Sequence, residues 1–97
     1  MSSYCILGNY TDQGIRNIKQ SPKRVDAGRD LAKSMGAELK EFYLAMGRFD
    51  FVVMLEAPSE EIAARYVLAL ASLGNVRTTT LKIFDETRYR DIVGKIA

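Results

Sequence analysis

The segment DFVVMLE, residues 50–56, gives the strongest sequence evidence for the fold. Its five consecutive apolar residues, Phe51 to Leu55, show no alternation and are too few for an ordinary helix. Such a run predicts a strand that is covered on both faces. Before it, residues 46–48 (Met-Gly-Arg) predict a short turn. After it, residues 58–61 (Pro-Ser-Glu-Glu) predict the start of a helix, with carboxylates placed to favour the helix dipole.

The residues before this segment predict a strand, a broken helix and a second strand. The strands are expected over Tyr4–Leu7 and Ala37–Ala45, where β-branched, aromatic and other apolar residues gather. Thr11 or Asp12 can cap the helix between them. Because proline disfavours helix at the residue before it, Ser21-Pro22 predicts a break near Ser21. The second part then has a buried face at i, i+3, i+4 and i+7, namely Gly28, Leu31, Ala32 and Met35.

The residues after the segment predict a helix, a fourth strand and a last helix. The first of these helices is expected to end at Gly74-Asn75. The fourth strand is expected over Val76–Phe84, where polar and apolar residues alternate in part. Asp85 can cap the last helix. Its apolar face is expected to comprise Tyr89, Ile92, Val93 and Ile96.

This order predicts a single α+β domain over residues 1–97 with a ferredoxin-like βαββαβ fold. Two right-handed crossovers interleave to give an antiparallel sheet of order 4-1-3-2 with both helices on one face. The opposite face then lacks a cover, although the third strand is apolar on both sides. A second copy of the chain is the simplest cover, which predicts a homodimer or higher homo-oligomer. Alternatively, the C-terminal helix folds over this face and leaves a monomer.

Composition narrows the classes of function. A net charge of +2 over 97 residues lacks the basic stripe that nucleic acid requires. With no histidine and one cysteine, the chain is expected to hold no metal or other cofactor, and a Ser-His-Asp mechanism is excluded. No signal peptide or apolar run of about 18 residues is present, so we expect a cytoplasmic protein without membrane association.

Four segments in the same order resemble the GYD domain family over about residues 4–84. They are residues 10–15, 36–37, 42–50 and 74–78. The family takes its name from a Gly-x-Tyr-Asp segment, and this chain has Gly47-Arg48-Phe49-Asp50, with phenylalanine in place of tyrosine. The family is similar to dimeric α+β barrel proteins. The resemblance therefore implies that fold and a homodimer, and it implies no particular activity.

The predicted strand order gathers four polar residues at one edge of the sheet, namely Tyr10, Tyr43, Asp50 and Arg77. Arg77 offers a planar fork for a carboxylate or phosphate, and the tyrosines offer hydroxyl groups. Asp50 would orient Arg77 or act as an acid or base. These residues are a candidate site for a small polar or anionic ligand. In the alternative interpretation, Asp50 and Arg77 form an ion pair between strand ends and the tyrosines are packing residues.

Two further features bear on function. Lys19, Lys23 and Arg24 form a basic cluster that is interpreted as a solvated face, which could still flank the entry of an anion. Cys5 is interpreted as a small buried hydrophobic residue. Three functions remain open: a ligand-binding homo-oligomer, a purely structural assembly module, and a cofactor-free enzyme such as an isomerase or monooxygenase. They are ranked in that order, the last by fold analogy alone.

Overall fold

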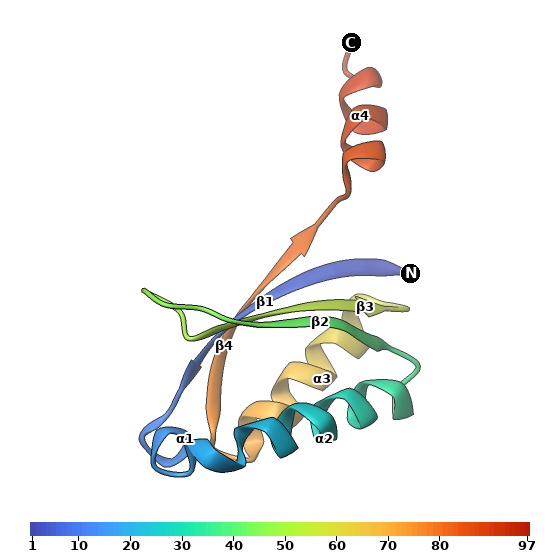
Figure 1. Ribbon diagram of the computed structural model, residues 1–97. Helices are drawn as coiled ribbons and strands as arrows, with labels where there is room; N and C mark the ends of the chain where they lie inside the picture. Colours follow the sequence, from blue (N-terminus) through green and yellow to red (C-terminus); the bar gives the residue numbers. More distant parts are fainter.

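A computed structural model describes all of residues 1–97 and shows one antiparallel sheet with helices (Figure 1). The elements follow the predicted order: β1 (Ser2–Tyr10), α1 (Asp12–Arg16), the 3₁₀ turn η1 (Ile18–Gln20), α2 (Ser21–Ser34), β2 (Glu38–Leu44), β3 (Phe51–Ala57), α3 (Glu60–Ser72), β4 (Val76–Ile83) and α4 (Glu86–Gly94). None of the helices combines the length and apolar character needed to cross a bilayer.

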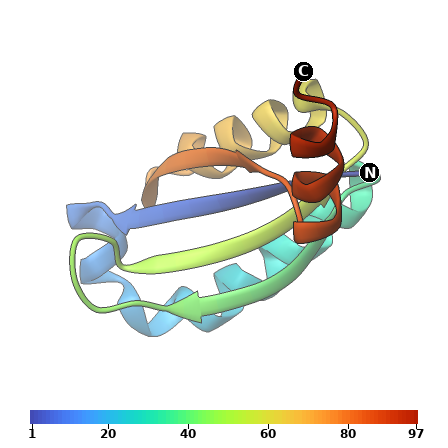
Figure 2. The ribbon, with the colours of Figure 1, turned by 90° about the horizontal axis from the view of Figure 1, so that it is seen from above.

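The sheet has the order β2-β3-β1-β4, which is the predicted order 4-1-3-2 counted from the other edge. All neighbouring strands are antiparallel, with Ile6 of β1 opposite Val53 of β3 on one side and Thr80 of β4 on the other. Helices α2 and α3 lie together on one face, on the far side of the sheet in Figure 2. The predicted ferredoxin-like α+β arrangement is therefore confirmed.

The core lies between the sheet and these two helices. Along β3, burial alternates, so that Phe51, Val53 and Leu55 are buried while Val52 and Met54 are half-buried. Within one chain, β3 is therefore covered on one face only, and the predicted cover of its second face by another copy stays a prediction. The helices contribute the small residues Ala32 and Ala63 and the large residue Tyr66 to this core.

The helix boundaries fall close to the predicted positions, although Ser21 is itself helical, with φ −56° and ψ −42°, and the break lies just before it. Helix α2 begins at Ser21 with Pro22 in its first turn, where a missing backbone N–H is tolerated. After α2, Gly36 has a φ of +77°, and Gly47 in the β2–β3 connection has a φ of +141°. Both conformations favour glycine, because a side chain is strained there.

The second face of the sheet is open. The strand registers place half-exposed side chains there in rows, with Tyr43, Val52 and Leu7 in one row and Met54 and Cys5 in the next. Cys5 is therefore not fully buried, contrary to its interpretation as a core residue.

Helix α4 does not cover this face. It continues from the end of β4 and projects away from the rest of the molecule (Figure 1). Its apolar residues stay exposed, with Tyr89 at 59% and Ile96 just beyond its end at 72%. The alternative of a monomer closed by its own last helix is therefore not what this structure shows.

Candidate functional site

The sheet places the two predicted site tyrosines on opposite faces. The Tyr10 ring packs against Phe51 on the helix side, with ring centroids 5.4 Å apart. Its hydroxyl lies 3.2 Å from Oγ of Ser21 at the start of α2. Tyr43 pairs with Val52 in the register of β2 and β3 and lies half-exposed on the open face. The two phenol groups therefore do not converge on one ligand.

Asp50 and Arg77 do not form the expected ion pair. Instead, Oδ2 of Asp50 accepts a hydrogen bond from the backbone N–H of Tyr10 at 2.9 Å, and its own N–H donates to the Gly8 carbonyl at 2.8 Å. Arg77 lies opposite Asn9, exposed on the open face, with no carboxylate within 4.0 Å. Of the four predicted residues, the structure joins Tyr10 and Asp50. One chain does not bring all four into a single site, and ligand binding by any of them stays a prediction.

On the open face, Tyr43 has a polar partner. Its hydroxyl donates a hydrogen bond to the Glu41 carboxylate. This bond raises the pKa of Tyr43 above its ordinary value, with smaller effects in the same direction from partial desolvation and from the negative charge of Glu41. The pair thus places a protonated tyrosine and a carboxylate beside the apolar rows of that face.

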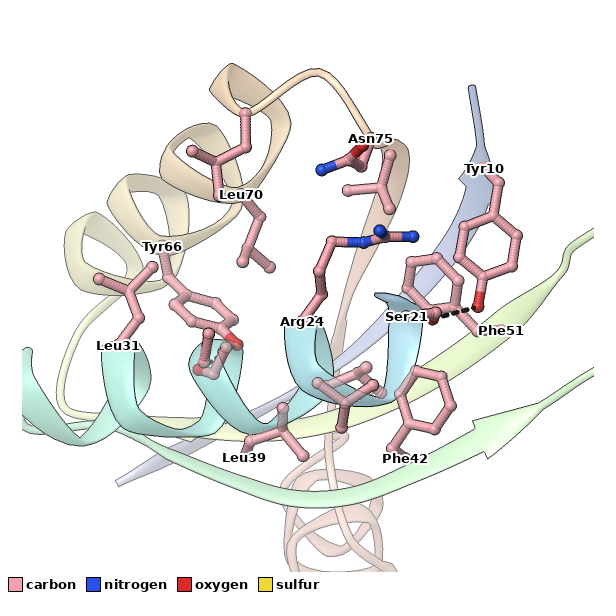
Figure 3. Close-up of a pocket in the computed structure, with 16 residues that line it drawn as sticks. Tyr10, Ser21, Arg24, Leu31, Leu39, Phe42, Phe51, Tyr66, Leu70 and Asn75 are labelled. Carbon is pink, nitrogen blue, oxygen red and sulfur yellow. Dashed lines mark hydrogen bonds between the residues drawn. The ribbon is translucent and has the colours of Figure 1, made fainter. Parts of the chain in front are cut away.

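The helix side contains a cavity of about 140 Å³ between the sheet, α2 and α3 (Figure 3). Twelve of its sixteen lining residues are hydrophobic, including Phe42 and Phe51, whose rings stack at a centroid distance of 5.6 Å. Polar groups come from Ser21, Arg24 and Asn75 and from the hydroxyls of two tyrosines. An apolar lining with a few convergent polar groups is typical of a small-molecule site.

Arg24 is the one charged residue of this lining. Its Nη1 donates to the Asn17 carbonyl at 3.0 Å and its Nη2 to the Gly14 carbonyl at 3.3 Å. No carboxylate lies within 4.0 Å of the guanidinium, although the side chain is half-buried. Figure 3 shows it extending from α2 on the side of the cavity where Tyr10 and Asn75 lie. A cation without an ionic partner is therefore built into the wall.

The sequence interpretation grouped Arg24 with Lys19 and Lys23 on a solvated face. The two lysines are exposed, as predicted, whereas Arg24 reaches the cavity. The available signal was spacing, because Arg24 precedes Gly28 by four residues and therefore lies on the same helix face. That spacing indicates a residue facing the core. At this position the structure agrees with the spacing and not with the solvated face that the charge pattern predicts.

Tyr66 adds a second hydroxyl deep in the lining. Its side chain is 1% exposed, and its hydroxyl donates to the Gly28 carbonyl at 2.8 Å. Burial raises the pKa of Tyr66 to about 12, against a smaller lowering effect of Arg29. Tyr66 is therefore neutral at physiological pH, and Arg24 alone gives the lining its charge.

The end of the cavity is held by contacts between α1 and the α3–β4 turn. The Thr11 N–H donates to the Asn75 carbonyl at 3.0 Å, and the Thr11 hydroxyl donates to the Gly74 carbonyl at 2.6 Å. Gly14 is buried against the same turn, where a Cβ atom would overlap the carbonyl oxygen of Asn75. These contacts hold the part of α1 that contains Gly14, whose carbonyl accepts a hydrogen bond from Arg24. No cluster of three or more His, Cys, Asp or Glu side chains is placed to bind a metal ion.

Comparison with known proteins matches these observations to a family. The family model of the GYD domain matches residues 4–93, which confirms the resemblance and extends it into α4. The chain is also 32% identical over 83 residues to the "Glutamine synthetase and cystathionine beta-lyase binding protein" of Thermus thermophilus. The match covers 84% of this chain and 87% of that protein.

Proposed function

The chain belongs to the GYD domain family, and we propose that it acts as a homodimeric protein that binds a small molecule in the cavity between the sheet and its helices. The observation that carries this proposal is the apolar cavity with a single cation in its wall. Binding is favoured over catalysis because the lining contains no Asp, Glu, His, Cys or Lys. Of its two tyrosines, Tyr66 resists ionisation, so the lining offers no carboxylate, imidazole, thiol or amine as a general base.

In this proposal, the ligand site keeps two of the four residues first suggested. Tyr10 contributes its ring and hydroxyl to the wall, and Asp50 fixes the backbone of Tyr10. Tyr43 and Arg77 lie on the opposite face and would instead border the contact between two copies. The ligand and the second copy would thus occupy different faces of one sheet.

The open face supports the homodimer. Val52, Met54, Leu7 and Cys5 form an apolar area on the two central strands, and nothing in the chain covers it. Contiguous apolar areas on a protein surface mark contact sites more often than chance. In a dimer with a two-fold axis, this area of one copy would pack against the same area of the other copy.

A second function is favoured by a separate observation. The relative from Thermus thermophilus is named for binding two enzymes, and such a role here would make the chain an accessory protein of other enzymes. The exposed apolar residues of α4, which lie outside the core, offer a surface for a protein partner. In a purely structural assembly role, the open face and the apolar residues of α4 would bind other subunits, and the cavity would bind no ligand.

Native mass spectrometry combined with a binding measurement tests the first proposal. We expect a dimer mass, and we expect binding of the neutral probe benzyl alcohol followed by NMR shifts of residues lining the cavity. Leu70→Trp should abolish this binding, because the larger side chain fills the cavity. Leu68→Trp on the outer face of the same helix, where Leu68 is 69% exposed, is the matched control and should bind normally. A folded Leu70→Trp protein that binds the probe as well as wild type contradicts the proposal.

A further inference from the structure

We infer that the ligand is a small monocarboxylate whose apolar body fills the cavity and whose carboxylate pairs with Arg24. This inference rests on the proposed function and adds the chemical class of the ligand. It uses three observations: the volume of the cavity, the state of the Arg24 guanidinium, and the hydroxyl pair that shares the wall with it.

The volume limits the size of the apolar body. Pockets for drug-sized ligands measure about 300–1,000 Å³, well above the 140 Å³ found here. An engineered apolar cavity of about 150 Å³ in another protein binds benzene. The present cavity therefore accepts one aromatic ring or a short branched chain of comparable size. A nucleotide, a flavin or a long fatty acid is too large.

The guanidinium selects the head group. Arginine carries five N–H donors, and two of the nitrogen atoms of Arg24 each donate to one backbone carbonyl. Donors therefore remain, and the half-buried positive charge has no carboxylate within 4.0 Å. A ligand carboxylate would satisfy both needs with charge-assisted hydrogen bonds in a planar geometry.

The hydroxyls of Tyr10 and Ser21 add a donor beside the same wall. They lie 3.2 Å apart, and either can donate to the other. Whichever hydroxyl accepts that bond keeps its own proton and can donate it to a second ligand oxygen. With one arginine and one such hydroxyl, the polar groups match a singly charged carboxylate. A phosphate dianion would lack a second cation, since Lys19 and Lys23 are exposed outside the lining.

A titration of the wild-type protein with benzoate, benzyl alcohol and inorganic phosphate tests this inference. Binding is measured at pH 7 by calorimetry and by NMR shifts of the cavity residues. We expect benzoate to bind at least about tenfold more tightly than benzyl alcohol, which has a similar ring without the charge. Phosphate should neither bind at this site nor displace benzoate.

Variants of Arg24 assign the effect to one side chain. Arg24→Gln should reduce benzoate binding to the level of benzyl alcohol and leave benzyl alcohol unchanged. Arg24→Lys keeps the charge but loses the planar fork, so intermediate binding of benzoate is expected. Lys23→Gln removes a neighbouring positive charge outside the lining and should leave both probes unaffected.

The outcomes separate this inference from the proposed function. Equal binding of benzoate and benzyl alcohol to wild type would overturn the carboxylate class while small-molecule binding stands. Failure of both probes to bind contradicts both proposals. Displacement of benzoate by phosphate would point to a general anion site and also overturn the inference. Because the wild-type comparison needs no variant, it decides the question even if Arg24→Gln does not fold.

Discussion

At the scale of single residues, Arg24 shows that a cluster of basic residues in the sequence does not place every one of them on the solvated surface. Three basic residues in six positions indicate a solvated face, and two of them, Lys19 and Lys23, are solvated. Arg24 differs because backbone carbonyls of Gly14 and Asn17 accept its hydrogen bonds. Those acceptors depend on how α1 folds back against α2, which composition does not reveal. The charge pattern alone therefore misses the charged group of the cavity, although the spacing of Arg24 from Gly28 places it on the core-facing side of the helix.

Asp50 shows the opposite error, because the sequence predicts a contact with Arg77 that the structure does not contain. Its position beside Arg77 at one edge of the sheet followed from the strand order, and that order is correct. Proximity along an edge does not say on which face each side chain lies. Arg77 points to the open face, whereas Asp50 caps the backbone of Tyr10. A shift of one residue along a strand moves a side chain to the other face of the sheet. Residues predicted to share an edge of the sheet are therefore weaker evidence for a common site than residues predicted to share a face.

Two buried tyrosines give a prediction at this scale. The Tyr4 side chain is 4% exposed and its hydroxyl has no hydrogen-bond partner, whereas the Tyr66 hydroxyl donates to Gly28. An unpaired buried hydroxyl destabilises the folded state, because it loses its bonds to water. Tyr4→Phe should therefore raise the free energy of unfolding by about 1 kcal/mol, and Tyr66→Phe should lower it by about 1 kcal/mol.

Urea unfolding monitored by circular dichroism measures both variants. Each substitution removes one oxygen atom from a buried ring, so the volume change is the same and the sign reports the hydrogen bond. A loss of stability in Tyr4→Phe similar to that in Tyr66→Phe would show that the Tyr4 hydroxyl has a partner, such as a bound water.

At the scale of elements, local chemistry was sufficient for most boundaries. The break near Ser21 and the caps at Thr11 and Asp85 each depend on residues within four positions of one another. The contact between α1 and the α3–β4 turn is different. Thr11 and Gly74 are 63 residues apart, and no local pattern indicates that their backbones meet. Helix ends were thus predictable, whereas β1 spans Ser2–Tyr10 and is longer at both ends than the predicted Tyr4–Leu7. The strand order was predictable too, but the contact of α1 with the α3–β4 turn was not.

A glycine substitution tests that contact. Gly14 packs against the carbonyl of Asn75, so Gly14→Ala forces α1 away from the turn. We expect the free energy of unfolding to fall by about 1–3 kcal/mol, the usual range for overpacking. The Arg24 contacts should loosen as well, because the Gly14 carbonyl moves.

Gly94→Ala provides the matched control. Gly94 is also helical, and nothing lies within 4 Å of the position that its Cβ would occupy. Both substitutions gain the higher helix propensity of alanine, about 1 kcal/mol, so their difference isolates the steric effect. Equal stability of the two variants in thermal and urea unfolding would rule out tight packing of α1 on the turn.

At the scale of the whole molecule, the topology was predictable because few arrangements satisfy two right-handed crossovers. The chain order β-α-β-β-α-β alone led to the sheet that the structure shows. On the open face, a single chain does not provide a cover for the apolar residues of β3. Val52 and Met54 are apolar but only half-buried, so the uninterrupted apolar run of β3 has a cover on one side only. The predicted dimer would account for that pattern.

A charge placed in the centre of the open face tests the dimer. Met54 lies between Glu41 of β2 and Cys5 of β1 in one row across the sheet. In a monomer, the long stem of a lysine at this position would leave its ammonium group in water. Between two sheets, the same charge would lose its water, and even with Glu41 beside it the desolvation of both charged groups would cost several kcal/mol for each copy. Met54→Lys should therefore raise the dimer dissociation constant at least about a hundredfold without unfolding the protomer.

Light scattering over a range of protein concentrations measures this constant, and circular dichroism confirms that the protomer stays folded. Leu68→Lys, on the exposed outer face of α3, is the control and should remain dimeric. A wild-type protein that is monomeric at micromolar concentration would contradict the dimer, and so would a Met54→Lys protein that dimerises as wild type does. In the latter case, the exposed apolar residues of α4 become the next surface to test for association of two copies, because the chain does not cover them itself.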